Sequence, residues 1–182
     1  MGLRKASSYS KRKVVPYTRV SKKKGKSFIK TVPPQKIVKF TMGNESLYNN
    51  GKLPIQLTVI STENAQIRHN ALEACRQYIN KKLETDFAGQ YLFKVLAVPH
   101  HIQRENKMLT GAGADRMQTG MQLSFGKTSG KAAIVKPGTR VFFFALPNQK
   151  AERLIRDTLR RVFPKLPCRM RVLSKTEVVL KH

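Results

Sequence analysis

The stretch PHHIQRENKMLTGAGADRMQTGMQLSFGKTSGK (Pro99–Lys131) decides how this chain is organised, because it separates two halves with the same order of expected elements. It holds five of the eleven glycines, and its middle, Lys107–Met121, mixes glycine, cations and methionine without a steady period. A connection this long is uncommon inside a compact domain and is usually functional or disordered. We therefore predict a projecting basic loop over residues 99–131, which we call the finger, on a folded body.

The half that precedes the finger has the pattern strand–helix–strand. A weak alternation over Lys36–Phe40 predicts a first strand, and the β-rich run LPIQLTVI (Leu53–Ile60) predicts a second. Thr62 can cap a helix from about Glu63 to Leu83, whose apolar positions recur every three or four residues. The apolar run YLFKVLAV (Tyr91–Val98) predicts a central strand.

The half that follows the finger repeats this pattern. A short strand is expected over 132–135 and a strongly apolar strand, TRVFFFAL, over Thr139–Leu146. Asn148 can cap the next helix, after which Cys168–Leu173 alternates as a strand does, and a last short strand is expected over 177–180. Two helices on one face of a mixed or mostly antiparallel sheet would bury both sets of apolar side chains, so we predict the α+β class.

The N-terminal segment is an arm of different composition. The first 44 residues contain no acid, and the first 39 carry 13 Lys and Arg. The segment is either a disordered tail that aids solubility or an arm that orders between phosphates, with Tyr9, Tyr17 and Phe28 available to stack on bases. The expected organisation is an arm over 1–35 and a single α+β domain over 36–182 that carries the finger.

The charge of the chain points to a polyanionic partner. Thirty-six Lys and Arg against ten Asp and Glu give a net charge of +26. Such a protein seeks a dense polyanion, for which nucleic acid is the first candidate and an anionic membrane surface the second. No run of 18 apolar residues exists, so we expect no membrane span. The lone Cys75 and Cys168 fit buried, reduced thiols in a cytoplasmic protein.

The chain contains fragments of three motifs for catalysis or cofactor binding, and none of them is complete. Gly126-Lys127-Thr128 resembles the end of a phosphate-binding P-loop, but Met121 stands where its first glycine belongs. Gly111-Ala112-Gly113 lacks the third glycine of a dinucleotide fingerprint. The adjacent His100 and His101 would point to opposite sides of an extended chain, which disfavours a metal site. We expect no enzyme, cofactor or metal, while an RNA-modifying or RNA-cleaving enzyme and a membrane- or nucleoid-binding protein remain the alternatives.

Several longer motifs point to one family. They are KxxPYTR (Lys13, Pro16–Arg19), VPPQKI (Val32–Ile37), MGN (Met42–Asn44), NALEACR (Asn70–Arg76), RENKMLTGAGADRMQTGM (Arg104–Met121) and FGKTSGKAA (Phe125–Ala133). In this order and spacing they resemble the large-subunit ribosomal protein called sixteen in bacteria and ten-e in archaea and eukaryotes. The GADR block and the basic arm are similar to the archaeal and eukaryotic branch, and we expect an archaeal-type member.

The resemblance implies an α/β-hammerhead-like fold in the large ribosomal subunit of the cytoplasm, beside other ribosomal proteins. It implies contacts with large-subunit rRNA and 5S rRNA, and a finger that points toward the peptidyl-transferase centre and helps to position aminoacyl-tRNA. The residues expected nearest tRNA, on its A-site and P-site side, are Arg104, Asn106, Lys107, Thr110, Gly111, Ala112, Gly113, Ala114, Asp115 and Arg116. The resemblance implies rRNA contacts for Arg12, Lys13, Tyr17 and Arg19, and we predict further rRNA contacts from the cations Arg4, Lys5, Lys11, Lys22, Lys23, Lys24, Lys26, Lys36, Arg68, Arg76, Lys127 and Lys131.

Overall fold

Two antiparallel sheets organise the part of the chain that the computed structural model describes, which is Ile29, residues 31–105 and residues 126–176. Along the chain the elements are β1 (Thr41–Gly43), α1 (Glu45–Asn49), β2 (Ile55–Ser61), β3 (Ala65–Arg68), α2 (His69–Phe87), β4 (Leu92–Val95), β5 (His101–Glu105), β6 (Lys127–Val135), β7 (Arg140–Leu146), α4 (Gln149–Val162), the 3-10 turn η2 (Phe163–Lys165) and β8 (Met170–Thr176). A five-stranded sheet has the order β1-β4-β7-β2-β8, and a three-stranded sheet has the order β3-β6-β5.

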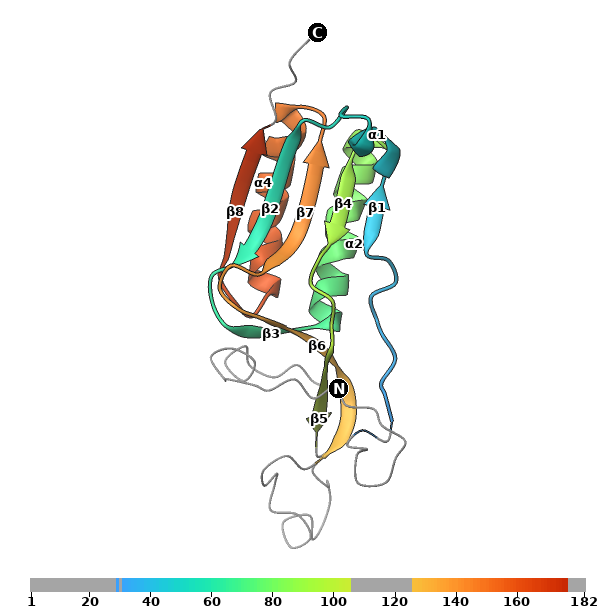
Figure 1. Ribbon diagram of the computed structural model, residues 1–182, viewed down its shortest axis with the longest axis vertical. Helices are drawn as coiled ribbons and strands as arrows, with labels where there is room; N and C mark the ends of the chain where they lie inside the picture. Colours follow the sequence, from blue (N-terminus) through green and yellow to red (C-terminus); the bar gives the residue numbers. More distant parts are fainter. Residues whose placement is uncertain (1–28, 30, 106–125, 177–182) are drawn as a thin grey trace, which may run out of the picture.

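The five-stranded sheet and the two long helices form the body. All of its strand pairs are antiparallel, and α2 and α4 lie against the same face of the sheet (Figure 1). The chain enters each helix from one strand and returns from it to another strand of this sheet, although β3 intervenes before α2. The α+β class, with two helices on one face of the sheet, is therefore confirmed.

The core lies between this sheet and the helices because the strands alternate. In β2 every second residue is buried, with Leu57 and Val59 fully inaccessible to solvent. The rings of Phe93 and Phe144 stack with their centroids 4.7 Å apart. Burial of each such side chain contributes about 1.5–3 kcal/mol, so this layer is a large source of stability for the body.

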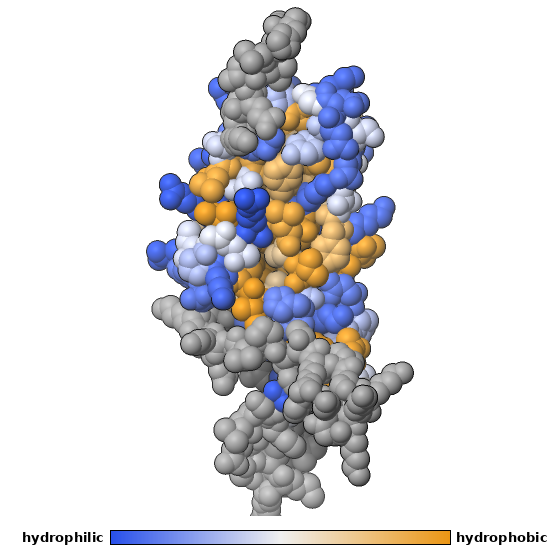
Figure 2. All heavy atoms as spheres, in the orientation of Figure 1, coloured by the Kyte–Doolittle hydropathy of each residue, from blue (hydrophilic) through white to orange (hydrophobic). Residues whose placement is uncertain are grey.

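The opposite face of the five-stranded sheet is partly apolar and open. Figure 2 shows apolar side chains gathered across the middle of this face. Phe143 lies there and packs edge-to-face on Tyr48 at 5.8 Å, and Leu173, opposite Thr58 in the ladder, is 45% exposed. The sheet is thus covered on one side by helices and only thinly on the other.

Both cysteines are buried and free, as predicted. Burial raises the pKa of the Cys75 thiol to about 12, so this side chain is a protonated apolar group in the core at neutral pH. Cys168 lies two residues before β8, and its sulfur accepts a hydrogen bond from Ser61 Oγ at 3.6 Å.

The first long helix begins later than the sequence predicts. It starts at His69, since Ala65–Arg68 form the short strand β3 against β6, and it runs on to Phe87. Ile67, which fits the apolar stripe of the expected helix, is instead buried in β3 opposite Ala133. The backbone bonds of this ladder outweigh a local helical preference over the first turn.

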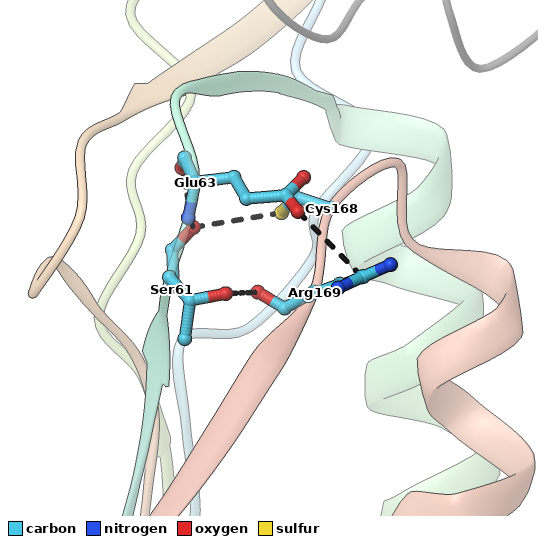
Figure 3. Close-up of polar contacts among 5 residues, drawn as sticks. Ser61, Glu63, Cys168 and Arg169 are labelled. Atoms are coloured by element: carbon cyan, nitrogen blue, oxygen red, sulfur yellow. Dashed lines mark hydrogen bonds and ion pairs between the residues drawn. The ribbon is translucent and has the colours of Figure 1, made fainter.

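Thr62, the expected helix cap, has a different role. Its hydroxyl donates to the Arg169 carbonyl at 3.0 Å, and its backbone N–H donates to the same oxygen. Figure 3 shows this junction, in which Arg169 also reaches Glu63 across 3.7 Å. These contacts tie the end of β2 to the beginning of β8.

The first strand is also shifted. Residues 36–40 are not a strand, although Ile37 is buried in the core, and β1 is the short Thr41–Gly43. Asn44 follows and caps α1 by accepting from the backbone N–H of Ser46 at 3.0 Å. A cap and a one-turn helix therefore follow β1.

In the second half, the observed elements lie closer to the positions that the sequence predicts. Asn148 caps α4 by accepting from the backbone N–H of Ala151 at 2.9 Å. The helix ends in η2, and the last strand is Met170–Thr176 rather than Cys168–Leu173. The strand expected over 177–180 lies outside the described residues.

Candidate nucleic-acid interface

A two-stranded ribbon carries the finger away from the body. Strands β5 and β6 pair antiparallel from His101 opposite Ala132 to Glu105 opposite Lys127, and they extend beyond the five-stranded sheet at one end of the molecule (Figure 1). The expectation of a loop over all of 99–131 is therefore wrong at both ends. The outer parts of the two strands are mostly polar or basic, but the antiparallel ladder satisfies their backbone groups and the third strand, β3, supports them.

Polar side chains join the three strands of this smaller sheet. Gln103 Nε2 donates to Gln66 Oε1 at 3.3 Å, and Ser129 Oγ donates to the Gln103 carbonyl at 3.4 Å. Because β3 continues directly into α2, the ribbon is anchored to the longest helix of the body. The base of the finger is thus held in a fixed direction.

Four of the predicted rRNA-binding cations lie on this sheet or near it. Lys36 and Lys127 are exposed, Lys131 is half-buried, and Arg68 is buried at the end of β3. Three of these cations lie close enough to one histidine, His69, for their charges to act on its ring. Desolvation by burial lowers the pKa of His69, and the charges of Lys36, Arg68 and Lys131 lower it further.

Arg104 lies on the ribbon itself, and it is the one residue predicted nearest tRNA that the structure describes. It is half-buried in β5 opposite Thr128. Its neighbours toward the tip, residues 106–116, and the predicted rRNA-binding residues of the arm, 4–26, lie outside the described residues. Their roles stay predictions.

Arg76 differs from the other predicted cations because it already has a carboxylate. Its Nε and a terminal nitrogen donate to both oxygens of Glu73 at 2.8 and 2.6 Å, and each side chain is 12% exposed. The hydrogen bond from Arg76 lowers the pKa of Glu73, and Glu73 in turn raises the pKa of Arg76. A phosphate at this position would compete with Glu73, which weighs against Arg76 as an rRNA contact.

The two adjacent histidines lie as the sequence predicts, on opposite sides of the chain. His100 is exposed, and its Nδ1 is 3.1 Å from the Val98 carbonyl oxygen, whereas His101 is buried. Burial lowers the pKa of His101, with further contributions from His100 and Arg104. Among residues 29, 31–105 and 126–176, no three His, Cys, Asp or Glu side chains gather as a metal site would require.

The sequence does not predict the contact between Gly130 and His69 in this region. Gly130 leaves room for the ring of His69, since a Cβ at position 130 would lie 3.2 Å from His69 Nε2. With the helix placed from Glu63, His69 lies inside a helix, and no local pattern brings it to β6. Only the pairing of β3 with β6 makes this contact.

None of the helices in the described ranges is both long enough and apolar enough to cross a membrane.

Comparison with known proteins identifies the family to which the chain belongs. The family model described as ribosomal protein L16p/L10e matches residues 13–173. A protein of Staphylothermus marinus named large ribosomal subunit protein uL16 is 42% identical over 176 residues, which is 96% of this chain and 95% of the relative. Proteins with the same name from Hyperthermus butylicus and Methanococcus maripaludis are 44% identical over 165 residues and 38% identical over 182 residues. They cover 89% and 98% of this chain, and 86% and 99% of the relatives. The predicted resemblance, including its archaeal type, is confirmed: this chain belongs to the ribosomal protein L16p/L10e family.

Proposed function

We propose that this protein is a structural constituent of the large ribosomal subunit, located in the cytoplasm, and that it binds large-subunit rRNA. The observation that carries the proposal is family membership over nearly the whole chain, at 42% identity to a relative named for that subunit. The net charge of +26 agrees with a phosphate-rich partner such as RNA. An isolated chain of this charge repels itself until a polyanion neutralises it.

Among the described residues, the ribbon is the part best placed for this role. Lys127 and Arg104 stand at its outer end, and the chain between 105 and 127 continues from there. Polar ties to β3 fix its direction, so that a finger could be presented to RNA from a rigid base. Loops that carry functional residues are commonly positioned by a rigid scaffold.

We further propose that the part of the finger from Arg104 to Arg116 lies near the peptidyl-transferase centre and helps to position aminoacyl-tRNA, while the body also contacts 5S rRNA and neighbouring ribosomal proteins. The support is the RENKMLTGAGADRMQTGM motif and the orientation of the ribbon that carries it. In this role RNA performs the chemistry, and the protein is a positioning component rather than an enzyme.

Sedimentation of cell extract tests the proposal. Tagged protein should travel almost entirely with large subunits in a sucrose gradient, and reconstituted core particles that lack it should take it up in a salt-sensitive manner. A pool that remains free of ribosomes under low salt, or that travels with membranes or DNA, would contradict the proposal. As a control, an unrelated basic protein of similar charge should not saturate at one copy per subunit.

A further inference from the structure

The face of the five-stranded sheet opposite the long helices carries a largely apolar patch. Thr58 in β2 pairs with Phe143 in β7 on one side and with Leu173 in β8 on the other, so the three side chains form one row across the sheet. Ile60, the next residue of β2 on this face, is half-buried. We call Thr58, Ile60, Phe143 and Leu173 the open patch. An exposed apolar patch with a polar rim commonly marks an interaction site.

The short helix α1 covers only one end of this face. Leu47 and Tyr48 pack there with Phe143 against the buried Leu53. Beyond them the face is uncovered: Leu173 is 45% exposed, and apolar side chains extend across the middle of the sheet (Figure 2). The open patch therefore has surface to offer to another molecule.

Two arginines flank Ile60 on this face. Arg140 of β7 and Arg171 of β8 are its cross-strand partners, and both side chains are exposed. Residues that pair across antiparallel strands have their side chains on the same face of the sheet. Because neighbouring strands lie about 4.8 Å apart, the backbones of the two arginines are roughly 10 Å apart, beside the open patch.

A β-bulge turns Arg140 to this face. Phe142 is buried in the core, so unbroken alternation would place residue 140 on the core side as well. Instead the register shifts: Phe142 pairs with Val59 and Arg140 pairs with Ile60, which leaves Val141 as the extra residue. Bulges re-aim side chains in this way and are frequent beside functional sites.

The charge of the two arginines is not balanced within residues 29, 31–105 and 126–176, where neither forms an ion pair with a carboxylate. Glu45 is already bonded to Lys94 of β4. By contrast, Arg76 on α2 and Arg156 on α4 each bind a carboxylate on their own helix. The uncovered face of the sheet thus combines apolar surface with unbalanced positive charge, and a partner that fits it is anionic.

These two properties together specify the chemistry of the partner. An unpaired stretch of RNA has charged phosphates, and its unstacked bases offer flat faces that pack on aromatic and arginine side chains. The bases of a duplex are stacked on one another and do not offer these faces. An acidic peptide would also meet the arginines, but the proposed role in binding rRNA favours RNA.

We propose that the open patch binds an unpaired segment of rRNA. The bases pack on the patch, and the phosphates pair with Arg140 and Arg171. Neither arginine is among the cations that the sequence analysis predicts to bind rRNA. The inference rests on the proposed function and adds to it a defined surface on the body, separate from the finger.

A tryptophan reporter tests the patch directly, because the chain contains no tryptophan of its own. In the full-length variant Leu173→Trp, a base that stacks on the indole quenches its fluorescence. Ala74→Trp, at an exposed position of α2, is the matched control. Both variants are titrated with a mixed-sequence single-stranded RNA, with a fully paired RNA of the same sequence and with polyglutamate. Since the replaced side chains are exposed, the variants should fold, which circular dichroism checks.

Single-stranded RNA should quench Leu173→Trp, fully paired RNA should quench it less, and Ala74→Trp should stay nearly unchanged. Adding Arg140→Gln and Arg171→Gln to Leu173→Trp should reduce the log–log salt slope of the quenching affinity by about 1.4, which is two phosphates at about 0.7 each. Adding Lys150→Gln and Arg153→Gln instead removes two exposed cations of α4 and should leave the slope unchanged.

Equal quenching by single-stranded RNA and by either fully paired RNA or polyglutamate would overturn the inference, and so would equal salt slopes for the two charge-matched variants. Absence of quenching at position 173, with wild-type protein still retaining large-subunit rRNA on filters, would overturn the inference alone. Absence of salt-dependent rRNA binding by the wild-type protein would overturn the proposed function together with it.

Discussion

At the scale of single residues, Gly43 is a position at which the fold leaves no choice of side chain. Its φ is +87°, and a Cβ there would lie 2.1 Å from the Tyr91 carbonyl oxygen. The close approach brings β1 against the start of β4, where the backbone N–H of Asn44 donates to that carbonyl at 2.8 Å. The glycine of the MGN motif is thereby explained by backbone geometry.

We expect Gly43→Ala to lower the free energy of unfolding by more than about 2 kcal/mol, because it adds a steric clash to a left-handed backbone conformation. Gly51→Ala is the matched control, since Gly51 has φ +69° but nothing within 4 Å of an added Cβ. It should cost only about 1 kcal/mol. Urea denaturation of both variants measures the difference, and equal losses would show that the Tyr91 carbonyl moves aside freely.

At the scale of elements, the ribbon and the finger are separable. The β5–β6 ladder holds residues 105 and 127 opposite each other, so the ends of the intervening chain are fixed by the body. Deleting Lys107–Arg116 shortens this connection by about half, and halving a flexible loop changes its closure free energy by only about 0.6 kcal/mol. The variant should therefore unfold within about 1 kcal/mol of the wild type and still enter large subunits.

Subunits that carry this deletion should bind A-site tRNA weakly or mature slowly, which filter binding of aminoacyl-tRNA and gradient profiles would measure. Replacing the same ten residues by a Gly/Ser linker of equal length separates the chemistry of the finger from its length. Unchanged tRNA binding and maturation in both variants would contradict the proposed role of the finger.

The elements also show what the sequence could and could not predict. Alternating β2, apolar β7 and capped α4 are determined by local patterns, and they were predicted within a few residues. By contrast, all four residues of β3 are buried, so no alternation distinguishes it from a helix turn. Residues 132–135 of β6 were predicted as a strand, but the outer parts of the ribbon, β5 and residues 127–131, are mostly polar, and only their pairing reveals them as strands. For the same reason the cations near His69 were predicted singly, whereas their approach to its ring depends on the β3–β6 ladder.

At the scale of the whole molecule, charge sets opposite responses to salt for stability and for binding. The free protein carries +26, and its self-repulsion acts over the Debye length, which falls from about 30 Å at 0.01 M to about 3 Å at 1 M salt. The melting temperature of the isolated protein should therefore rise with KCl over this range, while its affinity for rRNA falls.

Scanning calorimetry and filter binding in the same KCl series measure the two trends. Sucrose at constant ionic strength is the control for general effects of cosolvent on stability. A melting temperature that stays flat or falls with KCl would mean that the cations are already balanced within the free chain.

The strand order of the large sheet also bears on how the protein is made. β2, residues 55–61, lies between β7 and β8, and both of its partners come from the last third of the chain. During synthesis, one hydrogen-bonding edge of β2 therefore stays unpaired until β7, residues 140–146, has been translated, and the other until β8, residues 170–176, has been translated. An apolar strand with two open edges invites pairing with other nascent chains. The newly made protein thus has a long vulnerable period, in which a chaperone that shields β2 would keep it available for assembly.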